Sequence, residues 1–349
     1  MVKYLKMLLW PFSLLYGGVM QVRNTLYDKA ILSSERFAIP VIAVGNLTVG
    51  GTGKTPHVEY LLRLLHNYKI ATLSRGYKRK TSGFVLADGQ ATAASLGDEP
   101  YQYYRDFPGV AVAVSEGRVP GVQKLQQLVP ELEVVVLDDA MQHRPIKPSL
   151  NLLLTDYKRP FYNDFLLPAG LLREPRSGAA RADAIIVSKC PVQLPLLRQQ
   201  EIVACIRKYC RPAIPIFFSA FNYGEPVALG PQTAPSGQLI LLTGIANPEP
   251  LKVYLLKQGY KILQHLAYPD HHTYTIQDLQ KIKLMLQSDK YKNASVLTTR
   301  KDAVKLAGTD LHKLTQALPV FYIPIEVAFL DNKEKFDKLI LQHVRPRVK

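Results

Sequence analysis

The segment Val44-Gly-Asn-Leu-Thr-Val-Gly-Gly-Thr-Gly-Lys-Thr-Pro56 carries the strongest indication of the fold of this 349-residue chain. The apolar run 39–44 is typical of a buried strand, and apolar residues follow the stretch at helical spacing, at Val58, Leu61, Leu62 and Leu65. A glycine-rich turn that joins a strand to a helix and ends in Gly-Lys-Thr is the pattern of a phosphate-binding loop, or P-loop. We therefore expect a protein that binds a nucleoside triphosphate.

The residue types of this loop fit a triphosphate. Glycines let backbone N–H groups turn toward phosphate oxygens, and Lys54 has the reach to contact the β and γ phosphates. The Thr55 hydroxyl is an expected ligand of Mg²⁺. The usual spacing has a glycine where this chain has Thr48, a difference that nearby glycines can offset. The residues expected to hold the nucleotide are Thr48, Val49, Gly50, Gly51, Thr52, Gly53, Lys54 and Thr55.

A second run, Glu133-Val-Val-Val-Leu-Asp138-Asp139, supplies the acidic partner that a P-loop needs. Its apolar residues predict a buried strand, and a carboxylate at the end of a strand beside the P-loop is typical of a Mg²⁺ site, the Walker B pattern. Adjacent residues of a strand point to opposite sides, so Asp138 and Asp139 are expected to have different tasks. The pattern leaves open which of them faces the metal.

The composition indicates a globular protein with an anionic partner. The apolar content is 47% and the formal net charge is +16. Such a charge suits nucleic acid, acidic phospholipid or a phosphorylated small molecule. Because basic and aromatic residues are rarely interleaved, we do not expect a nucleic-acid partner. The three cysteines, Cys190, Cys205 and Cys210, have no paired spacing and fit a reducing compartment.

Residues 1–36 form a separate expected segment at the N-terminus. Residues 4–20 are rich in leucine and aromatic side chains, but Lys6 and Pro11 interrupt them, and the run is short for a membrane span of about 20 apolar residues. We expect a helix in the interface of the membrane, with aromatic side chains at headgroup level, at Tyr4, Trp10 and Tyr16. A helix packed on the domain is the alternative, and a single membrane span also stays open.

Apolar runs alternate with helical patterns through the rest of the chain, which is typical of an α/β protein with a mainly parallel sheet flanked by helices. We expect a P-loop core over residues 37–222 and a smaller C-terminal α/β domain over 237–349 that contributes to the active-site cleft. Further strands are expected at 70–73, 110–114, 134–137, 150–154, 184–187, 214–218, 239–242 and 295–298. Further helices are expected at 118–128, 248–257, 276–286 and 333–343.

Two acidic motifs are candidates for the group that activates a phosphate acceptor. In Gly97-Asp98-Glu99-Pro100 the aspartate stands at the expected start of a helix, where it is either a base or an ordinary N-cap. In Asp270-His271-His272 the histidines can orient a carboxylate, bind a metal or simply occupy a loop. Taken alone, the first motif favours an ordinary N-cap role for Asp98. The second motif does not favour any of the three roles of its histidines.

Taken together, the motifs of this chain resemble those of the tetraacyldisaccharide 4'-kinase family. They are Gly45-Asn-Leu-Thr-Val-Gly-Gly-Thr-Gly-Lys-Thr-Pro56, Ser74-Arg-Gly-Tyr77, Gly97-Asp-Glu-Pro100, Asp138-Asp-Ala-Met-Gln-His-Arg144, Leu171-Leu-Arg-Glu174, Pro269-Asp-His-His272 and Arg300-Lys-Asp302. The resemblance implies a kinase that uses ATP and Mg²⁺ to phosphorylate the 4'-hydroxyl of a tetraacyldisaccharide 1-phosphate, giving lipid IVA on the route to lipid A. It also implies a place at the cytoplasmic face of the inner membrane, and we expect a monomer.

The resemblance also implies roles for single residues. Asp98 is expected to accept the proton of the sugar hydroxyl, with His271 rather than His272 paired to it, while Lys54 neutralises charge on the transferred phosphate. The implied Mg²⁺ ligands are Thr55, Asp138 or Asp139, and Glu174. The residues implied to steady phosphates or the acceptor are His143, Arg144 and Arg173.

The chain departs from the family pattern in two places. Ala140-Met141 stands where the family commonly has Gly-Leu or Gly-Phe, and Arg300 stands where it commonly has Glu. Both flank the motifs and put only local geometry in doubt. The rival hypotheses are a P-loop GTPase or ATPase of the targeting or metal-insertion type, and an ATPase stimulated by nucleic acid. Neither rival explains the motifs at Asp98 and at Asp270-His-His together with an apolar, basic N-terminus.

Overall fold

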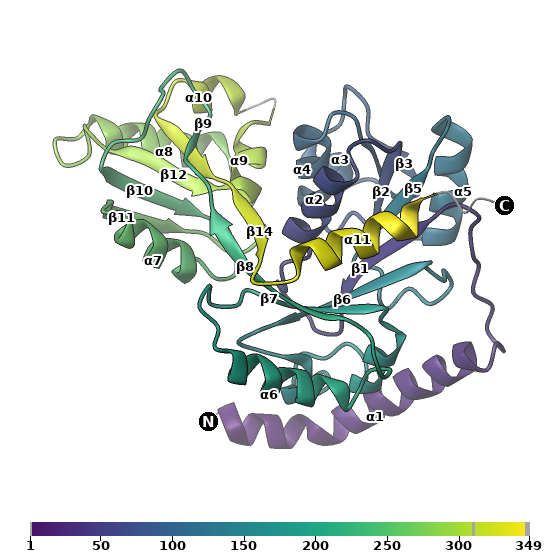
Figure 1. The fold of residues 1–349 in the computed structure, drawn as a ribbon. Coiled ribbons are helices and arrows are strands. Elements are labelled where there is room, and N and C mark those ends of the chain that lie inside the picture. The colour runs from purple at the N-terminus through teal and green to yellow at the C-terminus, as the bar shows by residue number, and fades with distance from the viewer. Residues whose placement is uncertain (1, 309–310, 346–349) are drawn as a thin grey trace.

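The computed structural model describes residues 2–308 and 311–345, with side chains from residue 8 onward, and forms two α/β units (Figure 1). A nine-stranded sheet is the centre of the larger unit, in the order β14-β8-β7-β6-β1-β5-β2-β4-β3. Its inner strands are parallel, and the edge strands β3 and β14 pair antiparallel. The strands are β1 (Val41–Asn46), β2 (Ile70–Ser74), β3 (Val85–Leu86), β4 (Ala111–Val114), β5 (Val134–Asp138), β6 (Leu150–Asp156), β7 (Ala184–Ser188), β8 (Ile216–Tyr223) and β14 (Ile325–Phe329).

Helices cover both faces of this sheet: α2 (Lys54–Leu64), α3 (Ala93–Leu96), α4 (Asp98–Asp106), α5 (Arg118–Leu128), α6 (Leu196–Arg207), α11 (Lys333–Val344), and the 3-10 helices η1 (Phe161–Asn163) and η2 (Arg176–Arg181). On one face, Leu61 of α2, Tyr103 of α4 and Phe336 of α11 share a core cluster with β1 and β6. On the other face, α5 packs through Val122 and α6 through Ile202. Burial on both faces explains why β1, β5 and β7 form continuous apolar runs.

The smaller unit has a five-stranded sheet in the order β11-β10-β12-β13-β9. Its strands are β9 (Val227–Ala228), β10 (Gln238–Thr243), β11 (Lys261–Ala267), β12 (Ser295–Thr299) and β13 (Val320–Ile323), and its helices are α7 (Glu249–Lys257), α8 (Ile276–Gln287), α9 (Arg300–Leu306) and α10 (His312–Gln316). Helices cover both faces, since Leu255 of α7 packs in one core cluster and Ile282 of α8 in the other. The expected second α/β unit is therefore present.

The chain crosses between the units twice, which corrects the expected limit of the smaller domain. It leaves the large sheet through β8 and returns as β14, which pairs with β8 from Ile325 to Phe329. After that return, α11 packs on the large sheet. The smaller unit therefore ends before residue 325 and does not extend to residue 349. Only Pro324 separates β13 from β14, so the sequence has no loop-rich stretch to mark the return.

The N-terminal helix α1 (Val2–Asp28) lies along the outside of the large unit (Figure 1). Polar groups on its inner side contact the large unit. The Ser13 hydroxyl donates to the Leu166 carbonyl (3.0 Å), and the Tyr16 hydroxyl donates to the Arg173 carbonyl (2.6 Å). Tyr16 is therefore directed into the protein. The expectation that it faces lipid headgroups is wrong.

The outer side of α1 is apolar and exposed. Its exposed side chains are Leu8, Trp10, Phe12, Leu14, Leu15, Val19 and Val22. The helix therefore packs on the domain, as the alternative expects, but it does so through polar groups and leaves these apolar side chains exposed. None of the helices in the described part of the chain has the length and apolarity that a bilayer crossing requires. The side chain of Tyr4 lies outside the described residues.

Candidate functional site

The P-loop runs from the end of β1 to the start of α2. Gly50 and Gly53 adopt left-handed backbone angles, with φ of 103° and 83°, which other residues rarely tolerate. At Gly53 a Cβ atom would also lie 2.5 Å from the Phe221 ring. Thr48, by contrast, is buried and forms an antiparallel bridge with Leu172. Its position therefore does not require the glycine of the usual spacing.

Asn46, the last residue of β1, organises the loop. Its Nδ2 donates to Thr52 Oγ1 (2.8 Å), and its Oδ1 accepts from Lys54 Nζ (3.4 Å) and from the Arg173 guanidinium. Lys54 also forms an ion pair with Asp139 at 3.4 Å, and Arg173 pairs with the same carboxylate at 2.7 Å. One amide and one carboxylate thus hold both cations beside the loop.

Asp138 and Asp139 have opposite electrostatic environments. Burial, together with repulsion from Asp139, raises the pKa of Asp138 to about 6, although Lys54 opposes the shift. Asp138 Oδ2 accepts from the Tyr103 hydroxyl (3.2 Å), and its buried Oδ1 has no hydrogen-bond partner among the described residues. Burial also opposes ionisation of Asp139, but Lys54 and Arg173 outweigh it and hold its pKa well below the ordinary value. The two carboxylates face different partners, as their adjacency predicts.

Glu174 faces the N-terminal helix. It is buried, and its oxygens accept from Arg181 (2.6 Å), Gln142 Nε2 (2.8 Å) and Asn24 Nδ2 (3.3 Å). Gln142 Nε2 also donates to the Asn46 carbonyl (2.8 Å), which connects Glu174 to the P-loop indirectly. Because Asn24 belongs to α1, these contacts tie α1 to the large unit. The expected role of Glu174 as a Mg²⁺ ligand stays a prediction.

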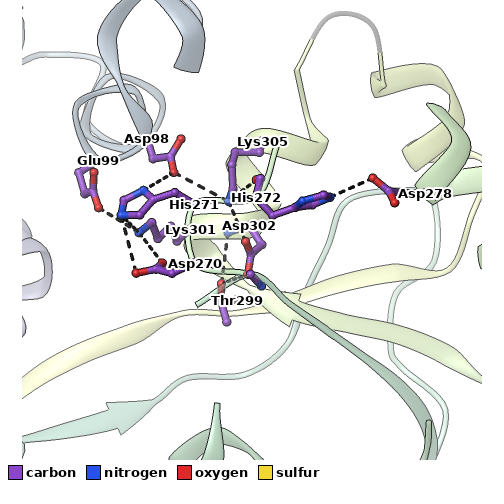
Figure 2. Close-up of polar contacts among 11 residues, drawn as sticks. Asp98, Glu99, Asp270, His271, His272, Asp278, Thr299, Lys301, Asp302 and Lys305 are labelled. Atoms are coloured by element: carbon purple, nitrogen blue, oxygen red, sulfur yellow. Dashed lines mark hydrogen bonds and ion pairs between the residues drawn. The ribbon is translucent and has the colours of Figure 1, made fainter. Parts of the chain in front are cut away.

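The second cluster joins the two units (Figure 2). Asp98 begins α4 in the large unit without capping it, and its Oδ2 accepts from His271 Nδ1 at 3.0 Å. His271 comes from the loop after β11, and its Nε2 lies 3.2 Å from Lys301 Nζ. Figure 2 shows His272 turned the other way, where its Nε2 contacts Asp278 at 3.1 Å. The structure thus pairs Asp98 with His271 and not with His272.

Two lysines of α9 set the charge of Asp98. Lys305 Nζ lies 3.8 Å from Asp98 Oδ2, and Lys301 forms an ion pair with the neighbouring Glu99 at 3.2 Å. Burial raises the pKa of Asp98, but the His271 hydrogen bond and the two lysines outweigh it and bring that pKa below the ordinary value. Asp98 is therefore ionised at neutral pH, which a proton acceptor requires.

Helix α4 connects the two clusters. Asp98 lies at its first position, and Tyr103 in its next turn contacts Asp138. Gln102, between them, donates to Glu59 of α2 at 2.6 Å and fixes α4 against the helix that follows the P-loop. The candidate base and the Walker B aspartate are thus attached to one rigid element.

His143 and Arg144 contact protein groups outside these clusters. His143 Nε2 accepts from the Arg118 backbone N–H (3.2 Å), and burial with nearby arginines lowers the pKa of His143 to about 4, so the ring is neutral. Arg144 pairs with Asp28 at 2.7 Å and lies over the Tyr27 ring. Of the three residues implied to steady phosphates, only Arg173 lies in the nucleotide cluster.

Five residues of these clusters have no role that the sequence predicted: Asn46, Tyr103, Gln142, Lys301 and Lys305. Asn46 offered a signal, because a polar residue at the end of a strand directly before a P-loop lies beside the phosphates. Lys301 and Gln142 stand inside family motifs. Tyr103 and Lys305 carried no such signal in the sequence. Their contacts form only in the folded protein, where Tyr103 of α4 contacts Asp138 of β5 and Lys305 of α9 contacts Asp98 of α4.

A family model described as tetraacyldisaccharide-1-P 4'-kinase matches residues 5–345. The chain belongs to this family. A tetraacyldisaccharide 4'-kinase of Flavobacterium psychrophilum is 45% identical over 349 residues, with 98% of each chain covered. One of Parabacteroides distasonis is 42% identical over 364 residues, with 98% of this chain and 95% of the relative covered. The family expected from the motifs is confirmed.

Within the 4'-kinase family, the chain is similar to a solved structure, the "apo" form of LpxK from Aquifex aeolicus in complex with ATP. The TM-score is 0.76 at 32% identity, and the match covers 97% of this chain and 99% of that one. The expected fold class, a mainly parallel P-loop sheet flanked by helices, is thereby confirmed.

Proposed function

We propose that this member of the 4'-kinase family transfers the γ-phosphate of ATP to the 4'-hydroxyl of a tetraacyldisaccharide 1-phosphate, giving lipid IVA. The observation that carries the proposal is the Asp98–His271 pair, built from both units and attached through α4 to the Walker B aspartate. A switch GTPase or ATPase passes phosphate only to water and has no use for such a pair. The family match and the ATP complex of the Aquifex LpxK support ATP as the donor.

In the proposed reaction, Asp98 accepts the proton of the sugar hydroxyl. The hydroxyl oxygen forms a bond to the γ-phosphorus while the bond from that phosphorus to the bridging oxygen of ADP breaks, and ADP leaves. His271 orients the carboxylate through Nδ1–H. Lys54 and the loop N–H groups neutralise charge on the moving phosphate. Because phosphoryl transfer depends mostly on position and charge, a base of low pKa is sufficient.

Mg²⁺ fits the Walker B end of the site. The ion commonly takes one or two carboxylates together with water and phosphate oxygens, so it does not need a cluster of several acidic residues. We propose Thr55 and Asp138 as its protein contacts, since the buried Oδ1 of Asp138 has no partner in the described part of the chain. Asp139 would instead hold Lys54 and Arg173 in position. The bound ion would neutralise charge on the triphosphate.

The apolar outer face of α1 supports action at a membrane surface. An acceptor with four acyl chains resides in a bilayer, and an amphipathic helix inserts its apolar face at the headgroup boundary. We propose that α1 lies in the cytoplasmic face of the inner membrane as a peripheral anchor. We also keep the monomer as a prediction, since one copy contributes every proposed catalytic group.

Replacement of the base tests the proposal. Asp98→Asn should lower kcat by about 10²- to 10⁴-fold, because it removes the proton acceptor, and should leave the Kd for ATP within about twofold. Both are measured with purified enzyme, ATP and a detergent-solubilised acceptor. His272→Gln is the matched control, because its ring contacts Asp278 and not Asp98. An Asp98→Asn enzyme that turns over at the wild-type rate would remove Asp98 from the reaction.

A further inference from the structure

His57 lies directly behind the P-loop and has no part in the chemistry above. It belongs to the first turn of α2 and is 3% exposed. Its Nδ1 lies 2.8 Å from the Gly53 carbonyl oxygen, and its Nε2 lies 3.0 Å from the Ser219 hydroxyl oxygen. A carbonyl only accepts, so Nδ1 carries the proton, and Nε2 accepts from the Ser219 hydroxyl. Both nitrogens of the buried ring are therefore used.

The contact with Gly53 orients the peptide group between Gly53 and Lys54, at the start of α2. The Gly53 carbonyl and the Lys54 N–H belong to one planar trans peptide and point in opposite directions. The backbone N–H of His57 lies 3.4 Å from the same carbonyl, so the imidazole, at 2.8 Å, is the closer donor. Because the ring holds the carbonyl toward α2, the Lys54 N–H is aimed into the loop, where phosphates bind.

The contact with Ser219 connects the loop to β8. Ser219 is fully buried, and two residues later the Phe221 ring closes against Gly53, where a Cβ would lie 2.5 Å from it. β8 is also the strand through which the chain enters the smaller unit, where Tyr223 stacks on Tyr254 of α7 with ring centroids 4.4 Å apart. The strand that joins the two units therefore braces the P-loop.

We propose that His57 is a positioning residue of the nucleotide site, which fixes the Gly53 carbonyl and ties it to Ser219 on the strand that leads to the smaller unit. The proposal rests on the proposed use of the P-loop for ATP. It concerns the affinity for ATP and not the transfer step, so a direct binding measurement separates it from the proposed function.

Three variants separate the two contacts of the ring. His57→Leu removes both, His57→Asn keeps a donor near the position of Nδ1, and Ser219→Ala removes only the tie to β8. Since a hydrogen bond contributes about a factor of five in affinity, we expect the Kd for ATP, from isothermal titration calorimetry, to rise about tenfold or more in His57→Leu. His57→Asn should recover most of this loss, and Ser219→Ala should raise the Kd about threefold.

Steady-state kinetics should show the same pattern, with KM for ATP raised and KM for the acceptor unchanged. His343→Asn is the matched control, because it removes another histidine–serine contact, with Ser149 at 2.8 Å, at the opposite end of the sheet. Its Kd for ATP should equal that of the wild type. If His57→Leu does not fold, the other two variants decide. A wild-type Kd in His57→Leu or Ser219→Ala, or an equal loss in His57→Asn and His57→Leu, would overturn the proposal.

Discussion

Asp138, Asp139 and Asp98 are three carboxylates whose pKa values the fold sets in different ways. Burial raises the pKa of Asp138 to about 6. Nearby cations lower the pKa of Asp139, and the hydrogen bond from His271 together with two lysines lowers that of Asp98. A residue with a raised pKa is ready to exchange a proton for a cation, and a residue with a lowered pKa stays ionised. The different tasks proposed for the three residues follow from these environments.

Glu59 gives a test of burial at the scale of one residue. It belongs to α2 and contacts Gln102 of α4, and burial raises its pKa from 4.5 to about 7, with Arg63 and Gln102 opposing the shift. The folded state therefore binds this proton more tightly than the unfolded state, so the free energy of unfolding should fall as the pH rises from about 4.5 to about 7, by on the order of 2–3 kcal/mol. Glu59→Gln should remove this fall.

The measurement is urea unfolding of both proteins at pH 5 and pH 8. The difference in stability between Glu59→Gln and the wild type should shift in favour of the variant at the higher pH. Glu334→Gln, at an exposed position of α11, is the control and should show no such shift. Equal pH dependence in the Glu59→Gln and wild-type proteins would mean that Glu59 titrates normally.

Single residues of the site differed in how well the sequence predicted them. The P-loop residues and Asp138 follow from local pattern, because a strand, a turn and a helix in fixed order determine where they lie. The partners of Asp98 do not, since His271 and Lys305 come from the other unit. Only the family resemblance brought Asp98 and His271 together before the fold was known.

Among the elements, α1 departs most clearly from the usual packing rule. Ser13 and Tyr16 contact the protein, whereas seven large apolar side chains of the helix are exposed. A soluble surface helix has the opposite arrangement, because exposed apolar area is unfavourable in water. The sequence indicated an amphipathic segment, but not which side would meet the domain.

The outer face of α1 should determine membrane binding. Each of Leu15 and Val19 is more than half exposed, and burying such a side chain in lipid contributes about 1.5–3 kcal/mol. Leu15→Glu with Val19→Glu should therefore weaken co-sedimentation with anionic vesicles at least about tenfold while the melting temperature stays unchanged. Leu256→Glu, at an exposed position of α7, is the matched control. Undiminished vesicle binding by the double variant would exclude α1 as the anchor.

For the whole molecule, the contact between the two units brings the parts of the candidate site together. Besides the Asp98–His271 pair, Arg300 of α9 forms an ion pair with Asp106 at the end of α4, so both ends of α4 contact the smaller unit. Arg300, which departs from the family pattern, thus has an acidic partner in this chain, Asp106. The sequence predicted two units but not that β14 and α11 return to the first, because a single proline separates β13 from β14.

Transfer of phosphate from ATP to a lipid-linked sugar is tested by following the phosphate itself. ATP labelled at the γ-phosphate is incubated with the enzyme and a detergent-solubilised tetraacyldisaccharide 1-phosphate, with and without the lipid, and the lipid is extracted. We predict label in the lipid fraction only when the acceptor is present, and its loss in Asp98→Asn. Label found only as inorganic phosphate, with or without the lipid, would exclude transfer to the sugar and indicate a switch NTPase.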